Sequence, residues 1–538
     1  MSQQDDTPLT PVEEFRLRAR RNRWIIAAAV VLLSGIGIYT RFVLPIPTDY
    51  VSVEEHFKYG SIGSDVDNGI PYWLWKVMPG LCPDHLERRG DGSSPDYRAF
   101  GFIQEPGHDR PIGFSKRQTS GIELVGLNCS VCHTGTVRSA PEAPREVVLT
   151  MPAHNLDLLA YFEFLFDCAG DSRFTVDNVM AHVDATTKLG PAERLIYRSA
   201  VPRLREALLA RAGRLAPLRT ERFRSGKGRI DTFNPYKAMV LNYPEVERAA
   251  PGASDLPSIW NQGIRKEMRL HWDGNNNSLF ERNISAAIGA GVTPTSVDLP
   301  RIERIAAWLQ MVPPPKAMAE ELHGGGFAAG KQLYGQHCNG CHGLPENKWQ
   351  GGRVGKVEPL AAIGTDPSRW LSYTYAFAES QWTIGAGHDW RFRHFRKTDG
   401  YANMPLDGVW ARAPYLHNGS VPTLRDLLNK PSHEDTPAQA ARFGALVEGK
   451  SPQQVERAVR EEIARSRAQG ERPLAFYRGY DVLDHDNVGF RADVGFEQKR
   501  RYHLYNTAQE GCHNTGHEYG TSLSAQEKEQ LLAFLKTL

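Results

Sequence analysis

The sequence contains two copies of the pattern Cys-x-x-Cys-His, which is the attachment pattern of a c-type haem. The first copy occupies residues 129–133 and the second occupies residues 338–342. Residues three apart share one face of a helical turn, so both thiols of a motif can reach the two vinyl groups of one porphyrin. The histidine that follows, His133 or His342, then becomes the proximal iron ligand. The motifs predict two covalently bound haem c groups, attached through Cys129, Cys132, Cys338 and Cys341.

Length and composition narrow the class of protein. A chain of 538 residues suggests two or three domains. It is 41% hydrophobic and 23% charged with a net charge of +2, so it lacks the basic excess of nucleic-acid binders, and we expect no nucleic-acid partner.

Three of the seven cysteines, Cys82, Cys168 and Cys512, lie outside the motifs. Two of them can pair in an oxidising compartment, or all can be buried thiols, and the sequence does not choose.

The N-terminus predicts a membrane anchor. Several arginines between Arg16 and Arg23 precede an uncharged run from Trp24 to Thr40. A cytoplasmic basic tail at 1–23 and a transmembrane segment at 24–46 follow from this pattern. The expected location is the bacterial inner membrane, single-pass, with the catalytic body in the periplasm. A cleaved signal peptide is the alternative, and the absence of a small-residue cleavage site near Pro45 disfavours it.

Helical periodicity recurs along the rest of the chain. Apolar spacing predicts helices over 155–166, 299–311, 328–336 and 451–467, and a terminal helix after the capping box Ser524-x-x-Glu527. Prolines at 313–315 indicate a boundary between a haem domain at 47–315 and a second one at 316–538. Residues 44–120 lack clear periodicity and are expected to form loops. The predicted fold class is mainly α, with two tandem cytochrome c-like domains, long loop-rich insertions and one preceding transmembrane helix.

Three further stretches carry a resemblance to a known family. They are Pro257–Asn261 followed by His271–Gly274, the run from Ala413 to Leu424, and Asn514–His517. With the two haem motifs, they resemble the bacterial di-haem cytochrome c peroxidase superfamily, and most closely its di-haem rubber-oxygenase branch. The resemblance spans roughly residues 50–538. It implies a catalytic N-terminal haem, an electron-transfer C-terminal haem and a small redox protein, cytochrome c or cupredoxin, as electron donor. Calcium is possible in such proteins but is not readable here.

The resemblance also assigns roles to single residues. Trp272 would lie between the porphyrins and relay electrons, with a buried core aromatic as the alternative reading. His417 could ligate iron, but a hydrogen-bonding structural role is the favoured interpretation. No methionine occurs in Leu427–Pro431, where the classical peroxidases carry the sixth ligand of the second haem. His517 is therefore the expected sixth ligand, and Met404 is the second choice.

The residues expected in the distal pocket of the first haem also differ from those of the peroxidases. They place an acid about twenty positions beyond the bridging tryptophan to move a proton between peroxide oxygens. The stretch 282–297 contains no Asp or Glu, and only Glu281 precedes it. Arg282, at its start, is the second residue assigned to catalysis. No histidine occurs in 134–153, which leaves His154 as a weak distal candidate. The pocket is predicted to be apolar and open.

Three functions are compatible with these features. The first is an oxidoreductase that activates an O–O bond, in peroxide or O2, at the N-terminal haem and receives electrons through the C-terminal haem. The second is a pure electron-transfer cytochrome whose irons both carry six ligands. The third is a haem-based sensor, which is disfavoured because no output module is recognisable in the sequence.

Overall fold

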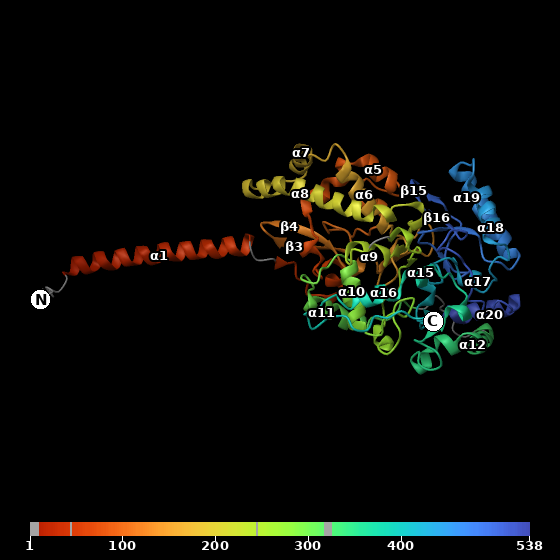
Figure 1. Ribbon diagram of the computed structural model, residues 1–538. Coiled ribbons are helices and arrows are strands. Elements are labelled where there is room, and N and C mark those ends of the chain that lie inside the picture. The colour runs from red at the N-terminus through yellow and green to blue at the C-terminus, as the bar shows by residue number, and fades with distance from the viewer. Residues whose placement is uncertain (1–9, 43–45, 244–245, 317–324) are drawn as a thin grey trace.

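The computed structural model describes residues 10–42, 46–243, 246–316 and 325–538. Helices and short strands alternate along the chain, and helix α1 (Pro11–Phe42) projects away from the rest of the molecule (Figure 1). The longer helices that follow in the first half are α4 (Tyr72–Leu81), α6 (Leu158–Gly170), α7 (Val176–Thr186), α8 (Pro191–Leu215), α10 (Leu279–Gly289) and α11 (Leu299–Leu309). Those of the second half are α12 (Gly325–His337), α18 (Thr436–Val447), α19 (Pro452–Ala468) and α20 (Ala525–Leu535).

Shorter helices connect these elements. They are α2 (Val53–Tyr59), α3 (Ser64–Asp67), α5 (Pro83–Arg89), α9 (Asn234–Met239), α13 (Asn339–His342), α14 (Leu360–Ile363), α15 (Ser368–Ser372), α16 (Tyr375–Gln381) and α17 (Leu424–Leu427). The strands are β1 (Ile46–Pro47), β2 (Ile70–Pro71), β3 (Phe114–Thr119), β4 (Ile122–Leu127), β5 (Thr134–Val137), β6 (Glu146–Leu149), β7 (Arg229–Asp231), β8 (Ala253–Asp255), β9 (Val357–Pro359), β10 (Gly400–Ala402), β11 (Ala475–Arg478), β12 (Leu483–Asp484), β13 (Gly489–Phe490), β14 (Phe496–Glu497), β15 (Arg500–Arg501) and β16 (His503–Asn506).

The strands correct the predicted fold class. Three strands of a four-stranded antiparallel sheet in the order β1-β3-β4-β2 lie within the region expected to be loops, and β4 follows directly after it; two-stranded ribbons occur elsewhere. Its central hairpin turns at Ser120 and Gly121, which have φ angles of 51° and 82°. Two consecutive residues with positive φ are typical of the tight turns that match strand twist. The chain is therefore mixed helix and strand rather than mainly α, and a tandem repeat of haem domains is not established.

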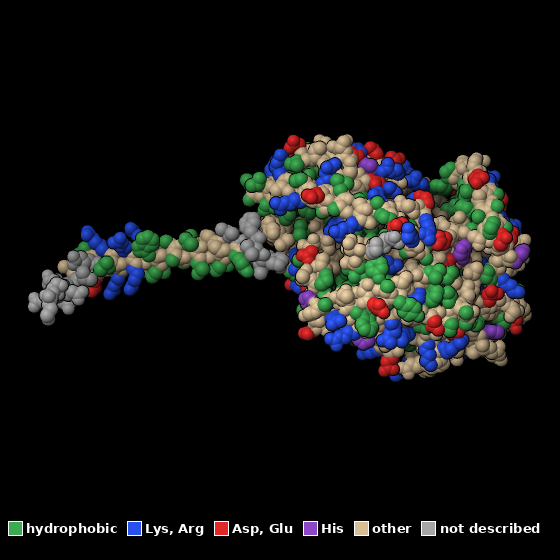
Figure 2. Space-filling view, viewed as in Figure 1, with side chains coloured by type: hydrophobic (Ala, Val, Ile, Leu, Met, Phe, Trp, Pro, Cys, Tyr) green, Lys and Arg blue, Asp and Glu red, His purple; other side chains and the backbone are tan. Residues whose placement is uncertain are grey.

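The predicted membrane anchor at 24–46 is wrong. Among the described residues, no helix combines the length and the apolar character that crossing a membrane requires. In Figure 2, blue arginine side chains cover the first part of α1 and green apolar ones follow. The inner-membrane location depended on this anchor and is wrong as well. Residues 1–9 of the predicted tail and 43–45 of the predicted anchor lie outside the described residues.

The periodicity-based helices are confirmed with small shifts at their ends. Helix α6 begins three residues later than expected, at Leu158, while α11 begins at Leu299 as predicted. Capping boxes are present at the start of α19, between Ser451 and Gln454, and of α20, between Ser524 and Glu527. These reciprocal bonds satisfy backbone groups that the first helical turn leaves free, which explains why the local sequence fixes both helix starts.

Helices α12 and α20 cross at close range in the second half (Figure 1). The ring of Phe534 lies 5.5 Å from that of Phe327 and 5.1 Å from that of Tyr334. At the crossing, a Cβ atom on Gly330 would lie 1.9 Å from the carbonyl oxygen of Gln530. Only glycine permits this approach. Because α12 leads directly into Cys338, the crossing positions the second haem motif.

We expect Gly330→Ala to destabilise this crossing. The added methyl group must push the helices apart, and overpacking of this kind costs about 1–3 kcal/mol. Chemical denaturation of the holoprotein, monitored at the haem absorbance, measures the change. Gly335→Ala is the matched control, since no atom lies within 4 Å of its Cβ position on the same helix. The control should be neutral or slightly stabilising, and equal effects of the two substitutions would refute the role of close approach.

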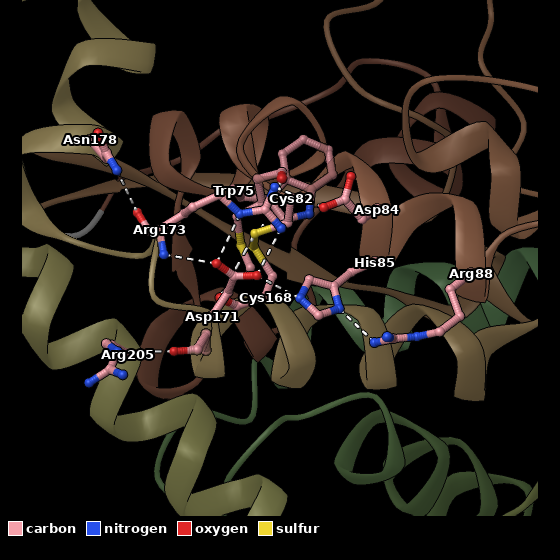
Figure 3. The surroundings of a disulfide bond; sticks show 12 residues. Trp75, Cys82, Asp84, His85, Arg88, Cys168, Asp171, Arg173, Asn178 and Arg205 are labelled. Carbon is pink, nitrogen blue, oxygen red and sulfur yellow. Dashed lines mark hydrogen bonds and ion pairs between the residues drawn. A yellow bond between two sulfur atoms is a disulfide. The ribbon is translucent and has the colours of Figure 1, made fainter.

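A disulfide joins Cys82 and Cys168 (Figure 3). It links the junction of α4 and α5 to α6, and both residues are fully buried. Next to it, Asp171 accepts bonds from His85 at 2.8 Å and from Arg173 at 2.8 Å. The pairing that the sequence left open is thereby settled, and Cys512 stays a buried free thiol.

Candidate haem sites

The first haem motif lies in a tight turn after β4. Residues Cys129–Val131 form a single 3-10 turn, and the side chain of Asn128 accepts a hydrogen bond from the backbone N–H of Ser130 at 3.1 Å. The Asn128 amide in turn donates to the carbonyl of Gly60 at 3.0 Å, which fixes the turn against the preceding segment. Both motif cysteines are free thiols, and burial raises the pKa of Cys129 to about 11. The turn therefore offers two protonated thiols on one short arc.

His133 is oriented as an iron ligand requires. Its Nδ1 lies 2.8 Å from the carbonyl oxygen of Pro257, so Nδ1–H donates and Nε2 keeps a free lone pair. Burial, reinforced by the charge of Arg282, lowers the pKa of His133 to about 3, and the ring is neutral. A backbone carbonyl on the second ring nitrogen is the usual support of a metal-bound imidazole. The residues of the first motif thus fit a haem.

The second motif repeats this arrangement on a helical turn. Helix α12 ends at His337, Cys338 follows, and the short helix α13 carries Cys341 and His342. His342 places its Nδ1 2.7 Å from the carbonyl oxygen of Met404, and burial lowers its pKa. The backbone of Met404 therefore supports the proximal histidine. That bond places the Met404 backbone on the side of the imidazole away from its free nitrogen.

His517 faces His342 across the space where the second haem would lie. The two ring centroids are 6.2 Å apart with an angle of 46° between the ring planes. Burial, and then the neighbouring His342, lower the pKa of His517 to about 3, so this ring is also neutral. His342 and His517 would together hold the iron of a haem attached at the second motif.

A buried arginine holds the His517 loop in place. Arg472 donates to the carbonyl oxygens of Gly516 at 2.7 Å and of His517 at 3.0 Å. His517 itself has a φ of 48°, an uncommon conformation for a residue with a side chain. Strained backbone of this kind is found where the surroundings impose it, often at functional sites. The loop therefore presents the imidazole at a defined position.

A cavity of about 980 Å³ lies beside the first motif, and we call it the His133 cavity. Cys129, Cys132 and His133 line it, together with Trp272, Arg282 and Met404. It therefore contacts the residue that supports His342 as well as the first motif. The Trp272 indole N–H donates to the backbone carbonyl of Asp255 at 2.9 Å, which anchors the ring at the cavity wall. The two residues assigned to catalysis thus lie at one cavity with the first motif.

Arg282 and His271 form the polar part of this wall. Burial lowers the pKa of Arg282 to about 10, and no carboxylate in the described ranges pairs with it. His271 also lines the cavity, with its Nδ1 2.6 Å from Asn275 Oδ1, and burial followed by the Arg282 charge lowers its pKa to about 3. Sequence reasoning missed His271. Its only sequence signal is its position directly before Trp272.

The acid expected in the peroxidases is not supplied by Glu281. Both of its carboxylate oxygens bind elsewhere, to the backbone N–H groups of Arg393 and His394 at 2.8 and 3.0 Å. Glu281 is not among the residues that line the cavity, and the three carboxylates that do line it each have a partner. Glu163 pairs with Arg89, Asp231 accepts from backbone N–H groups, and Asp255 pairs with Arg478. Burial raises the pKa of Asp255 to about 6.

Two further histidines lie apart from the described cavity lining. His154 places Nε2 2.9 Å from the carbonyl of Thr136 and stacks on Phe490 with ring centroids 4.1 Å apart. His417 stacks on Tyr401 at 4.0 Å, and its backbone carbonyl accepts from the N–H of Asp255 at 2.9 Å. Neither is among the residues that line the His133 cavity. Within the ranges described, no group of three or more His, Cys, Asp or Glu residues is arranged to hold a metal ion.

One segment of this chain matches the model of a known protein family, and the chain has relatives among known proteins. Residues 400–436, which include Met404 and His417, match a family described as RoxA-like, cytochrome c-like. Two relatives come from Sinorhizobium fredii strain NGR234, and both are uncharacterized. Protein y4iM is 32% identical over 212 residues, which covers 35% of this chain and 46% of that protein. Protein y4iJ is 25% identical over 579 aligned positions, which covers 86% of this chain and 85% of that protein.

The match defines the class of chemistry. A cytochrome c-like segment implies haem c, iron and electron transfer. The chain is thus similar to haem-dependent redox proteins, and its likeness to the rubber-oxygenase branch is supported over that segment.

Proposed function

We propose that this protein is a di-haem c-type oxidoreductase with one open and one closed iron. The first haem is attached in residues 47–315 through Cys129 and Cys132, and the second in residues 316–538 through Cys338 and Cys341. One observation carries the proposal: a cavity of about 980 Å³ adjoins His133, whereas a second imidazole stands 6.2 Å from His342. An occupied axial position suits electron transfer, and a vacant one suits catalysis.

The proposed reaction is activation of an O–O bond, in peroxide or in O2, at the first haem. A haem held by one imidazole supplies an iron that binds and reduces such oxidants. Around it, the apolar walls exclude water, and the uncompensated charge of Arg282 favours negative charge that develops in the cavity. His271 is neutral, and because its Nδ1–H donates to Asn275 Oδ1, Nε2 is left free to accept a hydrogen bond in the cavity. Trp272 would carry electrons between the haems, and a small redox protein would supply them.

Titration of the reduced holoprotein with carbon monoxide tests this asymmetry. We expect one CO bound for every two haems, because only the first iron has a free position. Rapid mixing with O2 and with peroxide then shows which oxidant is consumed. Failure to bind any CO would leave a pure electron-transfer cytochrome as the correct description, and two CO per chain would remove His517 as a ligand.

A further inference from the structure

The side chain of Arg353 contacts the second haem motif. Its backbone N–H donates to the carbonyl oxygen of Gly340, which lies between the two motif cysteines, at 2.8 Å. From there the guanidinium reaches Cys341, with Nη2 3.3 Å from Sγ. This sulfur is the atom that a haem would bind as a thioether. A permanent positive charge therefore lies at the attachment edge of the second haem.

The same guanidinium holds a buried carboxylate. Arg353 Nη1 lies 2.9 Å from Glu358 Oε1, and the side chain of Glu358 is 4% exposed, whereas that of Arg353 is 54% exposed. Strand β9 fixes Glu358, because it pairs with β10 and places Tyr401 opposite this residue. Within the described ranges, Glu358 Oε2 has no hydrogen-bond partner, and Arg353 alone forms an ion pair with this carboxylate. Glu358 thus depends on one guanidinium for its charge compensation.

This pair lies away from the carboxylates of the haem itself. Vinyl groups and propionates are on opposite edges of a porphyrin, and Arg353 contacts a sulfur that would be joined to a vinyl group. The carboxylate beside Arg353 is also an acceptor and cannot bind a propionate. The two residues are therefore placed to act on the charge balance of the haem. A cation nearby favours the ferrous state, and an anion nearby favours the ferric state.

We propose that the Arg353–Glu358 pair sets the reduction potential of the second haem. Two axial imidazoles stabilise ferric iron and so lower that potential. Arg353 offsets part of this effect, because it neutralises the buried carboxylate and places its own charge at Cys341. The haem then accepts an electron more readily from its donor. This inference rests on the proposed second haem and deepens its role in electron transfer.

Redox titration of the holoprotein, followed at the low-spin signal of the second haem, tests the proposal. Low ionic strength is used, because salt screens the exposed guanidinium. Arg353→Met should lower the equilibrium constant for reduction about tenfold, which is about 59 mV for a one-electron couple. Glu358→Gln, which keeps the size of the side chain, should raise the constant by a similar factor. The double variant should return close to the unaltered value, because it restores the net charge.

Lys356→Met is the matched control, since it removes an exposed positive charge from the same loop. The Nζ of Lys356 bonds to the carbonyl oxygen of Gly352 at 3.2 Å rather than to the motif sulfur. This variant should shift the potential much less than Arg353→Met does. Arg353→Lys keeps the charge and should retain most of the unaltered potential.

Shifts of the same sign in Arg353→Met and Glu358→Gln, or no shift in either, overturn the proposal. Opposite signs follow from charge, whereas a merely structural role moves both variants in one direction. The haem content of the second motif is measured before the titration. Its absence would overturn the proposed function together with this inference, while an unshifted potential overturns this inference alone.

Discussion

Replacement of His517 by alanine should convert the second haem from low spin to high spin. The two imidazoles face each other with 6.2 Å between ring centroids, and removal of one leaves a weak or absent sixth ligand. Because a second imidazole stabilises ferric iron, the reduction potential of this haem should rise as well. Absorption and electron paramagnetic resonance spectra of the ferric holoprotein measure the spin change.

Met404→Ala is the control for this ligand assignment. The bond from His342 uses the backbone carbonyl of Met404, which alanine retains, so this variant should keep the low-spin spectrum. A variant pair with the opposite behaviour, in which Met404→Ala loses the signal and His517→Ala keeps it, would show that methionine is the ligand.

Loss of the Cys82–Cys168 disulfide should produce the largest stability change. The bridge closes a loop with a sequence separation of 86 residues, for which the chain-entropy account gives roughly 4.6 kcal/mol. The double variant Cys82→Ala with Cys168→Ala should therefore unfold at a clearly lower urea concentration. Reduced unaltered protein provides the matched comparison and should lose a similar amount. Unchanged unfolding midpoints in both would show that the bridge does not stabilise the fold.

The sequence predicted the parts of the fold that depend on local interactions. The helix starts at Ser451 and Ser524 follow from capping boxes, in which partners lie three residues apart. The haem motifs are equally local, because Cys129, Cys132 and His133 are close in sequence. Their positions could be read directly, and the turns that carry them have the expected short helical form.

Features that depend on distant partners were not predictable in the same way. Strand β1 pairs with β3 across some 70 positions, and its two residues carry no alternating pattern of their own. The pairing of Cys82 with Cys168 depends on how α6 packs. His271 had no ligand pattern around it, and only the fold places it at the His133 cavity. The anchor prediction was wrong on other grounds, since no helix in the described part of the chain combines the length and the apolar character that crossing a membrane requires.

The asymmetry of the two irons is the central claim, and electron paramagnetic resonance of the ferric holoprotein tests it most directly. With both haems loaded, we expect two signals of equal integrated intensity. One should be low-spin, from an iron held by His342 and His517, and the other high-spin, from an iron held by His133 with a free or water-occupied position. Two low-spin signals and no high-spin component would contradict the account, because the first iron would then have no site for an oxidant.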